Sequence, residues 1–193
     1  MSAGAKARTA TCRLPHPRRV LVLAARVGDL AHRLLLVVLL LASFFVAGAQ
    51  TTPLVGKKAP EFSRTDFNGA KINLAGFRGK VVLLDFWATW CASCQVEMPT
   101  FVQWQRDYGP RGLQVIGISM DDDPTAARRL AAKLRLNYPV AMGDEKLGQI
   151  YGGVLGLPLT YLIDRHGIVR ARFQGETDLK TIEKQLKALL AEP

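Results

Sequence analysis

The chain has 193 residues, 49% of them hydrophobic, which is enough for one domain with its own core and leaves about fifty residues over. Its net charge of +10 would suit a nucleic-acid-binding protein, but residues 1–33 alone hold seven of the 26 basic residues and one of the 16 acidic ones. The remaining residues carry a net charge of +4, and their one close arginine pair, Arg128-Arg129, falls in a predicted helix. Because the predicted domain lacks a basic stripe, the sequence argues against nucleic acid as a partner.

An export signal is predicted at the N-terminus. The basic residues 1–33 form a predicted cytoplasmic leader, and residues 34–49 follow with no charge and a single polar side chain, Ser43. This apolar segment ends in Ala47-Gly48-Ala49, a pattern that a signal peptidase cleaves. Uncharged residues continue to Gly56, so an uncleaved membrane anchor is an equal alternative. Both outcomes place residues 50–193 outside the cytoplasm.

After a linker over 50–60, hydrophobic periodicity and turn residues predict alternating strands and helices over 55–190. In chain order the patterns predict a hairpin over 62–74, a strand over 81–86, a helix over 95–108 with a kink at Pro99, a strand over 113–120, a helix from 124 to about 136, a strand over 139–142, a short helix over 145–151, a hairpin of strands 159–164 and 168–174, and a last helix ending near 190. This order predicts an α/β domain with a mixed central β-sheet flanked by helices.

Two of the three cysteines fall in the predicted domain, since Cys12 lies in the leader. A disulfide between Cys91 and Cys94 would close too short a loop to stabilise the fold much. A zinc site needs four ligands, and the domain adds only His166 to the two cysteines. The Pro-x-x-x-Thr-x-x-Cys pattern of a peroxidatic cysteine is also missing. Redox chemistry is therefore the best explanation of the pair.

The position of the pair favours that chemistry. Cys91 follows a buried strand and enters a predicted helix, where backbone N–H groups stabilise a thiolate. We therefore expect Cys91 to be the exposed, attacking sulfur. Cys94 comes one helical turn later on the same face and would resolve a mixed disulfide.

Four segments resemble the TlpA/ResA-type thioredoxin-like family, which belongs to the redoxin/AhpC-TSA-like superfamily. They are Phe86–Pro99 around the cysteines, Gly156–Asp164, Gly56–Phe62 and Arg78–Lys80. The resemblance covers about residues 55–190 and implies a thioredoxin-like fold with an N-terminal β-hairpin. It also implies an inserted helix and strand around residues 121–144, since Pro158 comes 64 positions after Cys94.

The resemblance also implies site residues. Pro158 would form a cis bond with Leu157 beside the disulfide, leaving a backbone edge for an extended substrate peptide, and Trp90 would shape the same site. Asp85 would lie under the redox helix and accept the proton of Cys94. Glu97 would compete with Asp85 for that role, and the sequence leaves the choice open.

Alignment places Gly117 where thioredoxins often carry a lysine partner for the acid at Asp85. A second acidic segment, Asp121-Asp122-Asp123, superficially resembles a set of metal ligands. We interpret it instead as the solvated start of a capped helix.

These features predict an extracytoplasmic thiol:disulfide oxidoreductase, mainly a reductant of protein disulfides, supplied with electrons by a membrane donor. The expected redox group is the Cys91–Cys94 disulfide itself, with no bound cofactor or metal. ResA-like relatives reduce apocytochrome c, although Leu159 stands where the haem-maturation DsbE branch has a glutamate. Two alternatives stay open. One is a disulfide oxidant or isomerase, because Ala92-Ser93 is an uncommon spacer. The other is a binding module with a structural disulfide.

Overall fold

The computed structural model describes residues 54–193, so the predicted leader, the apolar segment 34–49 and the start of the linker lie outside the described residues. The elements in chain order are β1 (Ser63–Thr65), β2 (Lys71–Asn73), the 3-10 turn η1 (Leu74–Phe77), β3 (Val81–Trp87), α2 (Ala92–Tyr108), the 3-10 turn η2 (Gly109–Arg111), β4 (Leu113–Ser119), α3 (Pro124–Lys133), β5 (Val140–Met142), α4 (Glu145–Ile150), β6 (Leu159–Ile163), β7 (Val169–Gln174) and α5 (Leu179–Ala191). No helix in this part of the chain is long and apolar enough to cross a bilayer.

Five strands form a mixed central sheet in the order β5-β4-β3-β6-β7. The strand β3 lies in the middle, parallel to β4 and antiparallel to β6, and all seven of its residues are buried. The predicted α/β class and the mixed sheet are therefore confirmed. Because β3 and β4 are parallel, their C-terminal ends lie at the same end of the sheet, and the loops that follow the two strands are neighbours.

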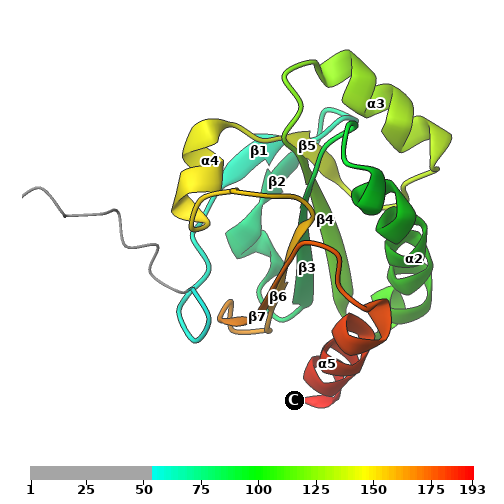
Figure 1. The fold of residues 1–193 in the computed structure, drawn as a ribbon. Helices are drawn as coiled ribbons and strands as arrows, with labels where there is room; N and C mark the ends of the chain where they lie inside the picture. The colour runs from blue at the N-terminus through cyan, green and yellow to red at the C-terminus, as the bar shows by residue number, and fades with distance from the viewer. Residues whose placement is uncertain (1–53) are drawn as a thin grey trace, which may run out of the picture. The chain divides into compact units, whose positions relative to one another are not determined.

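Alternation along the strands sends side chains into two cores. One core holds Leu83 and Trp87 of β3 together with the apolar faces of α2, α3 and α5. The other holds Leu84 and Phe86 together with the β1–β2 hairpin and α4. Figure 1 shows this division, with α2, α3 and α5 on one side of the sheet and α4, β1 and β2 on the other.

The N-terminal hairpin predicted around Asn68-Gly69 is present as the separate two-stranded sheet β1-β2. The Asp66 carboxylate accepts the backbone N–H groups of Asn68 and Ala70, and Gly69 has a φ of +88°, which glycine adopts at low cost. The predicted insertion is also present as α3 and β5.

Two helix boundaries differ from prediction. The helix α2 begins at Ala92 rather than Gln95, because Cys91 itself serves as its N-cap, and it continues through Pro99. The helix α3 ends at Lys133 rather than near 136, since Arg135 has a φ of +53° and the N–H of Leu136 bonds back to the carbonyl of Ala131. Such a left-handed terminus usually carries glycine, so an arginine there gave the sequence no stop signal.

Candidate active site

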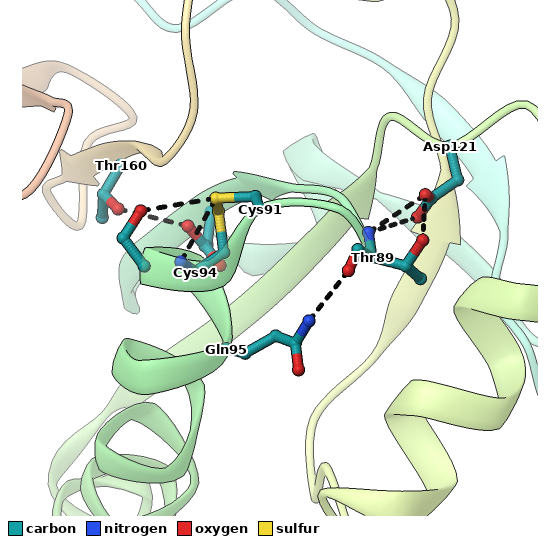
Figure 2. The surroundings of a disulfide bond; sticks show 8 residues. Thr89, Cys91, Cys94, Gln95, Asp121 and Thr160 are labelled. Atoms are coloured by element: carbon teal, nitrogen blue, oxygen red, sulfur yellow. Dashed lines mark hydrogen bonds between the residues drawn. A yellow bond between two sulfur atoms is a disulfide. The ribbon is translucent and has the colours of Figure 1, made fainter.

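Cys91 and Cys94 form a disulfide at the start of α2, directly after the loop that follows β3. The S–S bond is 2.02 Å long and the Cα atoms are 5.3 Å apart. The backbone N–H of Cys94 donates to the Cys91 sulfur at 3.2 Å, as Figure 2 shows. The first cysteine thus caps the helix with its own sulfur, at the place where a thiolate is stabilised by the N-terminal N–H groups.

The expectation that Cys91 is exposed is wrong for this disulfide form. Cys91 is 6% exposed and Cys94 is 1% exposed. The physical reason is the cap, because a sulfur that accepts the N–H of Cys94 is turned back over the first turn of α2. The first cysteine is still the more exposed of the two residues, and its role as the attacking sulfur stays a prediction.

The loop before Cys91 is fastened to the end of β4. Asp121 accepts both the backbone N–H of Thr89, at 3.0 Å, and its hydroxyl, at 2.6 Å. The Ser119 hydroxyl donates to the same carboxylate at 2.8 Å. The Gln95 amide donates to the carbonyl of Thr89 at 2.8 Å (Figure 2). These bonds fix the approach of the chain to the disulfide.

Only part of the acidic segment after β4 behaves as predicted. Asp123 caps α3 by accepting the N–H of Thr125, but Asp121 belongs to the redox site, a role that sequence reasoning missed. The position of Asp121 just after β4, the parallel neighbour of β3, could have indicated this role from the sequence. Within residues 54–193 no group of three or more His, Cys, Asp or Glu side chains could hold a metal ion.

Asp85 is a buried acid in the middle of β3, with 1% of its surface exposed. Burial, and then the charge of Glu97, raise its pKa to about 8, against the opposing effect of a hydrogen bond from the Thr160 hydroxyl. That bond measures 3.2 Å. The residue beside Asp85 on β4 is Gly117, as the alignment predicted, so β4 offers this acid no cation.

Glu97 is the second buried acid, one turn beyond Cys94 on α2 and 5% exposed. Burial raises its pKa to about 7, opposed by the backbone N–H of Thr177 and assisted by the charge of Glu176. Since Glu97 also raises the pKa of Asp85, the two carboxyl groups interact. Both have pKa values at which a carboxylate accepts a proton from a thiol near neutral pH.

The bond between Leu157 and Pro158 is cis, as the resemblance implied. Leu159 of β6 pairs with Phe86 of β3, so the next step of this antiparallel register brings Pro158 to the end of β3. The carbonyl of Pro158 accepts the N–H of Gly175 at 2.8 Å. In the part of the chain that the structure describes, the backbone of the half-buried Leu157 makes no hydrogen bond.

Three large apolar side chains around these segments are exposed to solvent. Trp90 precedes Cys91 and is 70% exposed, Val96 of α2 is 72% exposed, and Leu155 before the cis bond is 87% exposed. A hollow of about 240 Å³ opens beside α2, lined by Ser93, Val96, Glu97 and residues 176–179. Sequence reasoning named Trp90 but missed Val96 and Leu155, because nothing in a sequence pattern marks a single apolar residue as exposed.

A protein-family model described as the AhpC/TSA family matches residues 55–172. The chain belongs to the AhpC/TSA family. It is 37% identical over 137 residues to the thiol-disulfide oxidoreductase ResA of Bacillus thuringiensis subsp. konkukian, covering 70% of this chain and 78% of that relative. The ResA of Geobacillus kaustophilus is 30% identical over 140 residues, covering 72% and 80%.

Solved structures agree with these relatives. A Chlorobium tepidum protein assigned as the thiol:disulfide interchange protein DsbE superposes with a TM-score of 0.67 at 33% identity, covering 71% of this chain and 98% of that one. A thioredoxin-family thiol:disulfide interchange protein of Chlorobium tepidum gives a TM-score of 0.65 at 28% identity, covering 69% and 96%. The fold is therefore thioredoxin-like, and the chain is a thiol:disulfide oxidoreductase.

Proposed function

We propose that this protein reduces disulfides of other proteins outside the cytoplasm. The observation that carries the proposal is the capping of α2 by Cys91, which places a thiolate at the helix N-terminus with Cys94 one turn away. The Ala92-Ser93 spacer carries no charge, and the nearest ionisable groups on α2 and β3 are acids. A thiolate stabilised by the helix alone makes the disulfide a weak oxidant, which favours the reducing direction.

The reaction has two exchange steps. The Cys91 thiolate attacks the substrate disulfide, forming a mixed disulfide while the other substrate sulfur leaves as a thiolate and takes a proton from water. Cys94 then passes its proton to the carboxylate of Asp85 or Glu97, and its thiolate attacks the Cys91 sulfur. The Cys91–Cys94 bond forms, the second substrate thiolate leaves, and two electrons have passed to the substrate. The pair itself is the redox group, and no cofactor takes part.

Substrate proteins would bind along the rim of the site. The unpaired backbone of Leu157 offers hydrogen bonds to an extended peptide, in the manner of strand addition. Trp90, Val96 and Leu155 offer apolar contacts on either side. We include apocytochrome c among the substrates to be tested, since the matched relatives are ResA proteins.

Export would follow from the N-terminal segment. Residues 34–49 would act as a signal peptide or as an anchor in the cytoplasmic membrane, with the redox domain on the outer side. Because no soluble reducing pool is expected there, a membrane protein would return the Cys91–Cys94 disulfide to the dithiol. Cell fractionation with a protease-protection assay tests this location.

The test of the function is a trapping experiment with the full-length chain in cells. A Cys94→Ser variant is expected to accumulate mixed disulfides through Cys91, and mass spectrometry of the trapped partners identifies the substrates. The matched control, Cys91→Ser, is expected to trap nothing. An empty Cys94→Ser trap would favour a binding module, and a reduction potential near about −120 mV would instead indicate an oxidant.

A further inference from the structure

The sulfur of Cys91 accepts two hydrogen bonds. The backbone N–H of Cys94 donates to it at 3.2 Å, and the hydroxyl oxygen of Ser93 lies 3.6 Å from it. A disulfide sulfur carries no hydrogen, so the hydroxyl of Ser93 is the donor in the second contact. Among residues 54–193 this hydroxyl has no other hydrogen-bond partner. Its one contact within the described protein is therefore with the sulfur that is expected to attack the substrate.

The helix α2 brings the Ser93 hydroxyl to this sulfur. Cys91 is the N-cap of α2 and Ser93 is its second residue, so both lie in the first turn. The side chain of Ser93 is half-buried and forms part of the wall of the hollow of about 240 Å³ beside α2. Its neighbour Ala92 is exposed and has no polar atom in its side chain. Of the two spacer residues, Ser93 alone can donate to Cys91 from its side chain.

The charged groups around the cysteine pair and the hollow beside it disfavour a thiolate, because they are acids. They are Asp85 on β3, Glu97 on α2, Asp121 after β4, and Glu176 and Asp178 before α5. Between residues 54 and 193, none of the ion pairs includes one of these acids. Since nearby negative charge opposes the ionisation of a thiol, the thiolate depends on uncharged donors. Hydrogen bonds to an ionised acceptor are roughly twice as strong as those between neutral groups, so the Ser93 contact gains strength when the disulfide is reduced.

We propose that Ser93 is a catalytic residue, whose hydroxyl donates a hydrogen bond to the Cys91 thiolate of the reduced protein beside the N–H of Cys94. The proposal rests on the proposed attack of Cys91 on a substrate disulfide. In that step the thiolate forms a bond to one substrate sulfur, the substrate S–S bond breaks, and the second substrate sulfur leaves with the electron pair and takes a proton from water. Ser93 keeps its own proton and increases the fraction of Cys91 that is ionised at neutral pH.

The strength of one hydrogen bond sets the size of this effect. A single uncharged donor is expected to change the thiolate equilibrium about fivefold. Reducing and strongly oxidising thioredoxin-like proteins differ by a factor of roughly 10⁵ in the equilibrium between dithiol and disulfide. Ser93 therefore adjusts the reactivity of Cys91 without reversing the proposed direction of electron flow.

The test is a pH titration of Cys91 in the purified, reduced full-length chain. The rate of alkylation by iodoacetamide follows the thiolate, and tandem mass spectrometry distinguishes Cys91 from Cys94 and Cys12. Ser93→Ala removes the hydroxyl and is expected to raise the midpoint of thiolate formation by about 0.7 pH unit, which is the same fivefold effect. Ser93→Thr keeps the hydroxyl and should retain the parent midpoint. Ser63→Ala, the matched control, removes an exposed hydroxyl from β1 and should change nothing.

The redox equilibrium with glutathione measures the same contact independently. At a pH above the Cys91 midpoint, Ser93→Ala should favour the disulfide over the dithiol about fivefold, which lowers the reduction potential by about 20 mV. An unchanged midpoint or an unchanged potential in Ser93→Ala would overturn the proposal. An equal shift in Ser93→Thr would also overturn it, because the cause would then be the size of the side chain rather than its hydroxyl. Neither measurement needs a protein substrate, so an empty Cys94→Ser trap would reject the proposed function and leave this result in place.

Discussion

Asp121 holds Thr89 by its backbone N–H at 3.0 Å and by its hydroxyl at 2.6 Å, across 32 residues of sequence. The contact joins the loop before Cys91 to the short segment between β4 and α3, which carries Asp121. A third bond, from Ser119, orients the carboxylate. The loop that carries the attacking sulfur is thus held by an acid from the segment that follows the neighbouring strand.

The first prediction concerns this contact. Replacing Asp121 by alanine leaves two half-buried donors of Thr89 without a partner, so we expect Asp121→Ala to lower the free energy of unfolding by about 2 kcal/mol. The reaction of Cys91 with a disulfide should slow as well, because the loop is no longer held. Urea denaturation and stopped-flow kinetics measure the two effects. Asp122→Ala, which alters an exposed neighbour, should change neither, and equal behaviour of the two variants would show that the contact is unimportant.

Asp85 makes stability depend on pH. Its pKa rises from an ordinary value of 3.8 to about 8 in the folded chain, so between these values the folded state binds one proton more than the unfolded state. The contribution of protonated Asp85 to the free energy of unfolding is therefore fully present below about pH 4. It falls as the pH rises and is lost above about pH 8.

The second prediction follows from that sign. At pH 7 the Asp85→Asn variant should be more stable than the parent chain by roughly 2–4 kcal/mol, and the gap should widen with pH until about pH 8. Chemical denaturation of both proteins from pH 4 to pH 9 tests it. Asp122→Asn serves as the exposed control. A gap that is constant over this range would mean that Asp85 does not change its charge there.

The third prediction separates the two acids. The charge of Glu97 raises the pKa of Asp85, so Glu97→Gln should lower the pH at which Asp85 titrates below about 8. If Asp85 accepts the Cys94 proton, the pH profile of the rate of mixed-disulfide resolution should shift to lower pH together with the titration of Asp85. Rapid-quench kinetics on a preformed mixed disulfide provide the measurement. Glu145→Gln, an exposed change on α4, should leave the profile in place; loss of resolution at all pH values in Glu97→Gln would instead make Glu97 the acceptor.

Features carried by short segments could be predicted from the sequence. The apolar run of β3, the cysteine pair after it and the cis bond at Pro158 each depend on neighbouring residues, and each is present. The pairing of Asp85 with Gly117 also followed, because two uninterrupted parallel strands have a simple register.

Features that depend on distant packing could not be predicted. The hydrogen bond from Thr89 to Asp121 forms because the parallel strands β3 and β4 end side by side. The sequence does not show which partner a carboxylate in a run of three acids will bind. The burial of Cys91 depends on the direction of one side chain at the helix cap.

The last prediction concerns substrate binding at Trp90. This side chain is 70% exposed, so it contributes little to folding, and Trp90→Ala should leave the melting temperature within about 1 °C of the parent value. An exposed tryptophan beside a reactive sulfur is suited to contact with a partner protein. We expect kcat/KM for a trapped protein substrate to fall about tenfold, while the reaction with a small disulfide stays unchanged because it does not reach the rim. Val55→Ala, an exposed apolar residue whose neighbour Gly56 bonds to the start of β7, should affect neither reaction. An equal loss with both disulfides in Trp90→Ala would place Trp90 in the chemistry of Cys91 rather than in substrate recognition.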